Sequence, residues 1–307
     1  MSGIISGGDE LGSIVYPIPI VVFDSVAATA TILLALTLAP PVLSSKVHRS
    51  KLWLSMIATM MIFPLFYLLN VGSQFHNEDA PPIGLCILQA GFIYAGPPAA
   101  TTAVLCFITD MTLGLRSMLF NTKRSSFFIS FLIVLPSIIF ACVFFEAIAL
   151  VNRDRGVHFD ATHMFCESDN TGPQVKISAL LTVISLALTL CMEVWTVVTL
   201  YRNWSAVRTF RRTKTDVQLG VMIRLGIFTV IAGFAAVLGA VALPNNLHGQ
   251  SSWNIFLVTV PLLAALVFGT RRDIMSTYAC RRSRKSEFET TQSDIKVVEI
   301  YVQHGAV

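Results

Sequence analysis

The sequence predicts an all-α membrane protein: a seven-transmembrane helix bundle with its N-terminus outside and its C-terminus cytoplasmic. Composition and the placement of charge both lead to this fold class. The 307 residues are 54% hydrophobic and only 13% charged, whereas a soluble domain carries about 25% charged residues. A soluble core could not bury so much apolar sequence, so lipid must solvate much of the chain.

Seven apolar runs follow one another along the chain, and each is long enough for a helix that crosses the hydrocarbon core. The runs cover residues 18–42, 52–73, 85–115, 127–151, 176–201, 217–243 and 252–270. The third run is longer than a bilayer requires, so we expect it to tilt or to project at one end. The seventh run is a minimal span.

The segments that flank this transmembrane domain, residues 18–270, are polar. Residues 1–17 contain acids but no Lys or Arg, which is not the basic start of a cleaved signal peptide. We therefore expect an extracellular N-terminus. Residues 271–282 form a basic juxtamembrane segment, and residues 283–307 are polar and aperiodic, as expected of a flexible cytoplasmic tail.

Basic residues alternate between the connections of the runs. Of the 22 Lys and Arg residues, only Arg153, Arg155 and Lys176 fall in connections assigned to the outside. Because Lys and Arg stay cytoplasmic, this distribution sets the orientation and supports the helix count independently. The positive charge would then face anionic membrane lipids and cytosolic partners, and it does not indicate nucleic-acid binding.

The six cysteines are sorted by this topology. Cys86, at the head of the third run, and Cys166, in the outer loop 152–175, alone face the oxidising side, so we expect a disulfide between them. Two free thiols are the alternative. Cys280 lies among juxtamembrane basic residues, which suits S-palmitoylation, although an unmodified thiol remains open. The other three fall inside runs and should pack as small apolar residues: Cys106, Cys142 and Cys191.

Ionisable residues inside apolar runs are functional candidates because burying them in lipid is costly. Asp24 and Glu146 fall in outer halves, where they could meet a ligand or bond to neighbouring helices. Asp110, Glu193 and Arg224 fall in inner halves. Pairing of Arg224 with either acid would form a switch that latches the sixth run to a neighbour and that a ligand could bias.

The residues that an enzyme would need are missing from the runs. The seventh run has no Lys for a retinal Schiff base, and every His lies outside the runs, whereas a zinc hydrolase needs buried ligands. His158, His163 and Cys166 have a spacing that could suit a metal, but a disulfide-bonded Cys166 could not ligate one. We therefore expect neither an enzyme nor a cofactor or metal.

The basic inner loops suggest a surface for an acidic partner. Arg208, Arg211 and Arg212 share one face if the fifth helix continues past residue 201. Arg116 ends the third run on the same side. Ordinary anchoring of basic residues at the membrane would give much the same composition and is the alternative.

Seven runs, an outer N-terminus, the cysteine pair and basic inner loops together resemble a G-protein-coupled receptor. The segment from Pro261 to Tyr278, with Phe268-Gly269 before Asp273, resembles the end of the seventh helix in fungal a-factor-type pheromone receptors. Cys86-Ile-Leu-Gln-Ala is similar to the expanded receptor-like seven-span family of mushroom-forming fungi. The first inner loop lacks the Arg-Asn of the pheromone receptors, which argues against a pheromone ligand.

This resemblance implies a plasma-membrane receptor that passes the signal of an extracellular ligand to a heterotrimeric G protein. Coupling would use Arg116, Arg208, Arg211 and Arg212. The outer cavity would be lined by polar and aromatic residues of the outer halves: Asp24, Gln89, Phe92, Tyr94, Glu146, Trp253 and Asn254. A transporter or channel, marked by a continuous polar row through the bundle, and a non-signalling scaffold, marked by the lack of an outer cavity, remain as alternatives.

Overall fold

The structure is a computed structural model of the chain, which forms two compact units, Met1–Thr270 and Arg271–Val307. The helices and strands from α1 to α8 belong to the first unit. The structure describes residues 18–43, 49–71, 82–120, 125–154, 157–159, 164–168, 172–203, 226–230, 233, 251–270 and 274.

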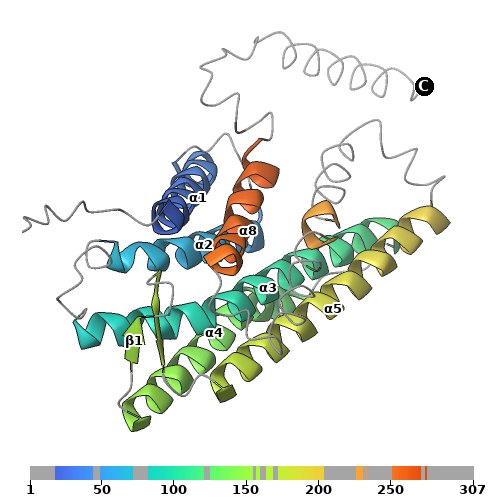
Figure 1. The fold of residues 1–307 in the computed structure, drawn as a ribbon. Helices are drawn as coiled ribbons and strands as arrows, with labels where there is room; N and C mark the ends of the chain where they lie inside the picture. The colour runs from blue at the N-terminus through green and yellow to red at the C-terminus, as the bar shows by residue number, and fades with distance from the viewer. Residues whose placement is uncertain are drawn as a thin grey trace, which may run out of the picture. The chain divides into compact units, whose positions relative to one another are not determined.

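The described part of the first unit is almost entirely helical (Figure 1). Its elements in chain order are α1 (Ile18–Leu43), α2 (Lys51–Tyr67), the 3-10 turn η1 (Leu68–Asn70), α3 (Ile83–Phe120), α4 (Ser126–Asp154), β1 (Val157–Phe159), β2 (Cys166–Ser168), α5 (Gly172–Arg202) and α8 (Ser251–Gly269). The helices α1 to α5 are each long and apolar enough to cross a membrane, and α8 contributes a shorter apolar stretch, Leu257–Gly269. The predicted helical architecture is confirmed for the described residues, and it is compatible with a multi-pass membrane protein.

The first five predicted runs coincide with α1 to α5, and the seventh coincides with α8. The sixth run, 217–243, is described only at residues 226–230 and 233, which are helical. Between α4 and α5 the chain forms a short β-hairpin, in which β1 and β2 pair in antiparallel register with Phe159 opposite Cys166. This pairing satisfies backbone groups that would otherwise be buried against α3.

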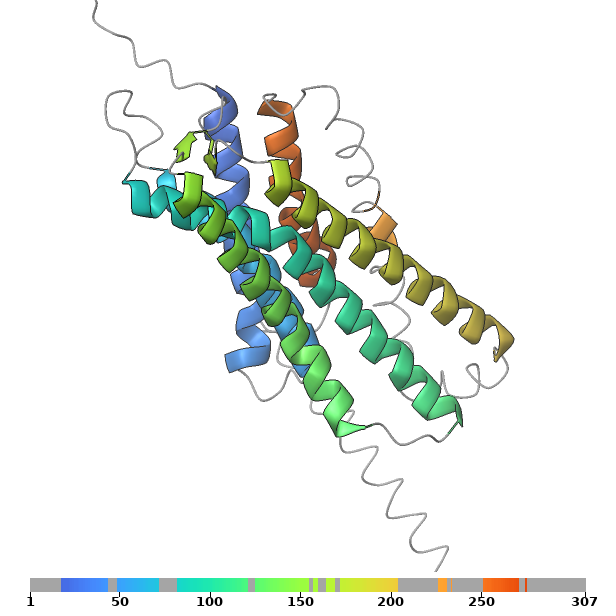
Figure 2. The same cartoon turned by 90° about the horizontal axis from the view of Figure 1, so that it is seen from below.

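The helix α3 is the central element of the bundle. It packs against α2, α4 and α5, and these contacts are visible in two views (Figures 1 and 2). Within its most apolar window 72% of the residues are buried, against 17% for α4 and 22% for α5. Glycines permit the close approach of two neighbours, since a Cβ at Gly91 or Gly96 would collide with the rings of Phe144 and Phe63.

The two ends of α3 serve as reference points for the bundle. Cys86 and Arg116 are about 45 Å apart at a helical rise of about 1.5 Å per residue, and we call these the disulfide end and the Arg116 end. The disulfide end gathers Phe23 of α1, Tyr67 of α2, Met164 of the outer loop and Val258 of α8 in one apolar cluster. Consequently α8 begins at the disulfide end.

The helix α5 runs to the opposite end, where Thr196 contacts Thr112 of α3. Between α5 and α8 in sequence, the helical residues 226–230 contact both of these helices. The Thr229 hydroxyl donates to Glu193 of α5 at 2.7 Å, and the Phe228 ring meets Phe268 of α8 edge-on, with 6.1 Å between centroids. This described segment therefore lies between α5 and α8.

Candidate functional site

The predicted disulfide is present and joins Cys86, in the first turn of α3, to Cys166 of β2. The two Cα atoms are 5.3 Å apart, and both residues are buried. The bridge fastens the β-hairpin of the outer loop to the central helix. It closes a chain segment that contains the remainder of α3 and all of α4, so the loop cannot leave the bundle while the bond is intact.

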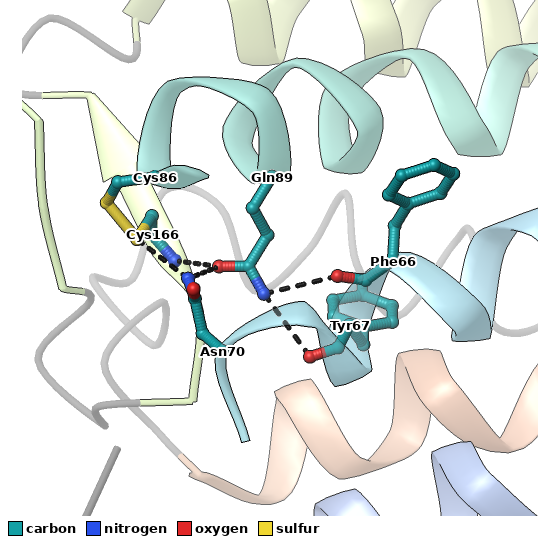
Figure 3. The surroundings of a disulfide bond; sticks show 6 residues. All are labelled: Phe66, Tyr67, Asn70, Cys86, Gln89 and Cys166. Atoms are coloured by element: carbon teal, nitrogen blue, oxygen red, sulfur yellow. Dashed lines mark hydrogen bonds between the residues drawn. A yellow bond between two sulfur atoms is a disulfide. The ribbon is translucent and has the colours of Figure 1, made fainter. Parts of the chain in front are cut away.

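Beside the disulfide, the side chain of Gln89 connects three separate segments (Figure 3). Its Nε2 donates to the carbonyl oxygens of Phe66 at 3.3 Å and Tyr67 at 3.2 Å. Its Oε1 accepts from Asn70 Nδ2 at 2.6 Å and from the backbone N–H of Cys166 at 3.0 Å. We call this set of residues, with the disulfide, the Gln89 cluster.

These four hydrogen bonds use the full capacity of a glutamine amide, which has two donor hydrogens and two acceptor lone pairs. The two carbonyls belong to the last turn of α2, where the Phe66 carbonyl also accepts from a backbone N–H at the C-cap. Gln89 therefore caps α2, holds η1 through Asn70 and fixes β2. We expected Gln89 to line a ligand cavity, but in this state its amide is committed to the protein.

Aromatic side chains shield the Gln89 cluster from the α1 side. Tyr67 is fully buried, and its ring meets Phe23, Phe63 and Phe165 edge-on with centroid separations of 5.0, 4.9 and 6.0 Å. Because this surrounding is apolar, each hydrogen bond of Gln89 is stronger than it would be in water, and the loss of any partner is more costly.

A second aromatic group joins α2, α3 and α4 on another side. Phe92 stacks on Phe66 and lies 5.3 Å from Phe140 and 5.0 Å from Phe144 between ring centroids. Phe92 was expected to contact a ligand. The structure places its half-buried ring in helix packing, at a position where aromatic contacts contribute about 0.5–1.5 kcal/mol beyond area burial.

The remaining expected ligand residues are spread around the disulfide end. Asp24 is half-buried beside Phe23, and Asn254 is buried beside Ile255, so both adjoin the apolar cluster. The Tyr94 carbonyl accepts from the Ser178 hydroxyl at 2.7 Å. Glu146 is half-buried on α4, and Trp253 lies in the first turn of α8. The structure thus brings the helix segments that carry Asp24, Gln89 and Asn254 close to the apolar cluster of the disulfide end. Glu146 lies on α4, which contributes no residue to that cluster.

Towards the Arg116 end, α3 and α5 meet through hydroxyl groups. Thr102 contacts Ser185 at 3.2 Å, and Thr112 contacts Thr196 at 2.6 Å. We call these four residues the hydroxyl seam. Thr112 and Thr196 also lie within donating distance of carbonyls of their own helices, 2.9 and 2.7 Å away. Since each hydroxyl has one hydrogen, the bond across the helices competes with these local bonds.

The expected switch residues are partly described. Glu193 accepts from Thr229, a hydroxyl partner from the expected sixth run. Asp110 is nearly buried on α3. Arg224 lies outside the described residues, as do Arg208, Arg211, Arg212 and Cys280, so the latch, the inner-loop coupling face and the lipidation site stay predictions.

Sequence reasoning missed three features of the site. Asn70 was overlooked because it ends an apolar run without a motif, and Trp195 because a lone aromatic inside a run carries no signal. The hydroxyls of α5 had a usable signal, since four of them recur at helical spacing and are all buried: Ser178, Ser185, Thr189 and Thr196.

No protein-family model matches the sequence, and no curated protein matches it either.

Proposed function

We propose that this protein is a plasma-membrane receptor that transmits an extracellular ligand signal to a heterotrimeric G protein. The observation that carries the proposal is the construction of α3. One end is bonded covalently to the outer loop through Cys86. The other end, about 45 Å away, contacts α5 through a hydroxyl pair and through the stacking of Arg116 on Trp195.

The orientation of the proposed receptor follows from the disulfide. The separation of Cys86 and Arg116 exceeds the hydrocarbon thickness of about 30 Å, so the two residues belong to opposite sides of a membrane. Disulfides persist on the oxidising side, so the disulfide end would be extracellular. The start of α1 shares this end through Ile20 and Phe23, which supports an outer N-terminus.

A count of seven spans is part of the same proposal. The chain leaves α5 at the Arg116 end and enters α8 at the disulfide end, which supports one further crossing by the expected sixth run, 217–243. With α1 to α5 and α8, the proposed receptor then has seven spans and a cytoplasmic C-terminus.

Ligand recognition is assigned to the disulfide end, and coupling to the opposite end. A ligand that contacted Asp24, Glu146, Trp253 or Asn254 would act on helices that surround the Gln89 cluster. A shift of α3 against α5 would then alter the cytoplasmic surface that includes Arg208, Arg211 and Arg212. Such an effect requires the ligand to bind the shifted arrangement more tightly than the resting one.

A transporter or channel is the second candidate, and the row of buried hydroxyls on α5 favours it. A solute path needs polar groups that can exchange their partners. Thr182, Thr189 and Thr196 each donate to a carbonyl one turn earlier in α5, a use typical of helix packing. The receptor is therefore the better supported of the two.

The proposal is tested by G-protein activation in a yeast reporter strain, with and without a broad ligand set. The native chain is compared with a variant carrying Arg208→Ala, Arg211→Ala and Arg212→Ala. A matched control carries Arg281→Ala, Arg282→Ala and Arg284→Ala, which removes the same charge from the tail. An epitope at the N-terminus, read on intact cells, gives the surface level and tests the orientation.

Signal from the native chain and the tail variant, but not from the loop variant at equal surface level, supports a coupled receptor. An equal loss of signal in both variants would indicate that the basic residues of the loop only anchor the protein at the membrane. If the well-expressed native chain activates no G protein with any ligand, and cells that express it take up a labelled solute, the protein is a transporter and the receptor proposal is wrong.

A further inference from the structure

Arg116 and Trp195 form a pair on the outer surface of the bundle. The guanidinium carbon of Arg116 lies 5.2 Å from the centroid of the Trp195 ring. Arg116 is exposed, and Trp195 is 49% exposed. Stacking of this kind fixes a guanidinium in place while leaving its N–H donors free for a second partner.

A second pair of the same type shows what is unusual here. Arg49 lies 5.4 Å from the centroid of Trp53, but Trp53 is only 2% exposed. Its backbone N–H is also held by the Ser50 hydroxyl at the start of α2. The Arg49 pair thus covers a tryptophan of the core, whereas the Arg116 pair faces outward, where lipid surrounds a membrane helix.

The outward face of α5 changes character along its length. Leu188, Trp195, Val198 and Arg202 recur at helical spacing and are all exposed. In this order the face is apolar at Leu188, aromatic at Trp195, apolar again at Val198 and basic at Arg202. Side chains of a helix lean towards its N-terminus, so Arg202 leans back towards the level of Trp195 and Arg116. The sequence of chemical types matches that of a phospholipid, from acyl chain to interface to phosphate.

The carboxylates closest in sequence are engaged elsewhere. Glu193 accepts from Thr229, and Asp110 is nearly buried on α3. Within the described part of the chain, neither Arg116 nor Arg202 has an ion pair. Among the residues that the structure describes, this surface has two positive charges and no paired carboxylate, so it complements an anion.

We propose that Arg116, Trp195 and Arg202 bind the phosphate group of an anionic phospholipid, with an acyl chain along Leu188 and Cys191. The guanidinium groups would donate charge-assisted hydrogen bonds to the phosphate oxygens. Trp195 would mark the interfacial level, where tryptophan is enriched. The distance of about 45 Å from Cys86 places Arg116 at the headgroup level of the opposite leaflet, since a bilayer with headgroups measures about 40–45 Å.

This assignment does not depend on the receptor proposal, because it requires only that the bundle be embedded in a membrane. It also gives Arg116 a role other than the partner-coupling role expected from the sequence. The lipid would bridge α3 and α5 beside the hydroxyl seam. The contact between the two helices would then depend on the lipid composition of that leaflet.

The test uses the full chain in nanodiscs of phosphatidylcholine containing a minor fraction of phosphatidylserine. Native mass spectrometry counts the phosphatidylserine molecules that remain bound after release. We expect preferential retention by the native chain and about tenfold weaker retention in Arg116→Gln and in Arg202→Gln, since each loses charge-assisted bonds. The matched control is Arg49→Gln, which removes one charge and one stacked arginine and should retain the lipid as the native chain does.

Equal retention in the native chain and in both site variants overturns the proposal, and so does an equal loss in Arg49→Gln. Displacement of the lipid by millimolar inorganic phosphate would also overturn it, because the site would then be one for a free anion. If Arg116→Gln does not give monodisperse protein, a fluorescence measurement on the native chain tests the proposal instead. Brominated phosphatidylserine should quench the Trp195 fluorescence, defined by difference from Trp195→Phe, more than brominated phosphatidylcholine does.

Discussion

The two ends of α3 are held in the bundle by different kinds of contact. At the disulfide end, a covalent bond and four hydrogen bonds of one buried glutamine fix three segments to each other. At the Arg116 end, the polar contacts between α3 and α5 include two hydroxyl pairs and one arginine stacked on a tryptophan. The first set breaks only at high cost, whereas the second can exchange partners cheaply.

This difference suggests where the bundle can move. A hydroxyl of the seam that loses its partner on the other helix still has a carbonyl of its own helix to bond. Gln89 has no such alternative, because the partners of its amide come from two other segments, residues 66–70 and Cys166 of β2. We therefore expect α3 to act as an element that is fixed at one end and adjustable at the other, as a hinge or shear motion requires.

Removal of the disulfide should have the largest effect. The double change Cys86→Ser with Cys166→Ser should destabilise the protein by about 2–5 kcal/mol, because the loop is no longer tied to α3. Thermal unfolding in detergent and the surface level in cells measure this loss. The control Cys142→Ala removes an exposed free thiol and should change stability by less than about 0.5 kcal/mol. Equal stability of the double variant and the native chain would contradict a fixed end.

Replacement of Gln89 by a residue of similar shape should have the next largest effect. Gln89→Met keeps the volume but removes the acceptor of the Cys166 N–H, one acceptor of the Asn70 amide, and the amide donor to the Phe66 and Tyr67 carbonyls. Each buried orphan group costs about 1–3 kcal/mol, so we expect a total loss of about 3 kcal/mol in thermal unfolding.

A ligand role for Gln89 predicts a different result. If Gln89→Met is as stable as the native chain but no longer responds to an agonist, Gln89 contacts the ligand, as the sequence predicted.

The smallest effect is expected at the hydroxyl seam. Thr112→Val or Thr196→Val removes one cross-helix contact, and hydrogen bonds between membrane helices contribute about 0.6 kcal/mol on average. A double-mutant cycle of the two changes should give a coupling energy of this size.

The control for the seam is Thr59→Val, because Thr59 donates only to the Ser55 carbonyl of its own helix in the described contacts. A coupling energy above about 2 kcal/mol would show that the Arg116 end is as firmly held as the disulfide end, and would remove the contrast between them.

The sequence predicted the features that depend on length and on side of the membrane. The runs that became α1 to α5 and α8 were visible because a lipid-spanning helix must be apolar over about 20 residues, whatever it packs against. The pairing of Cys86 with Cys166 followed from topology, since only these two were assigned to the oxidising side. Both inferences use only the position of a residue along the membrane normal, and neither needs the arrangement of the helices.

The sequence could not predict which faces meet, and only the tertiary structure decided this. In lipid, buried and exposed helix faces are both apolar, so hydrophobic periodicity carries little information about packing. The capping of α2 by Gln89, the hydroxyl pairs between α3 and α5, and the outward position of Trp195 all depend on rotations and contacts of particular helices. The amide of Gln89 illustrates the difference: its cost of burial was readable from its place in an apolar run, but its partners came from segments 19 and 77 residues away.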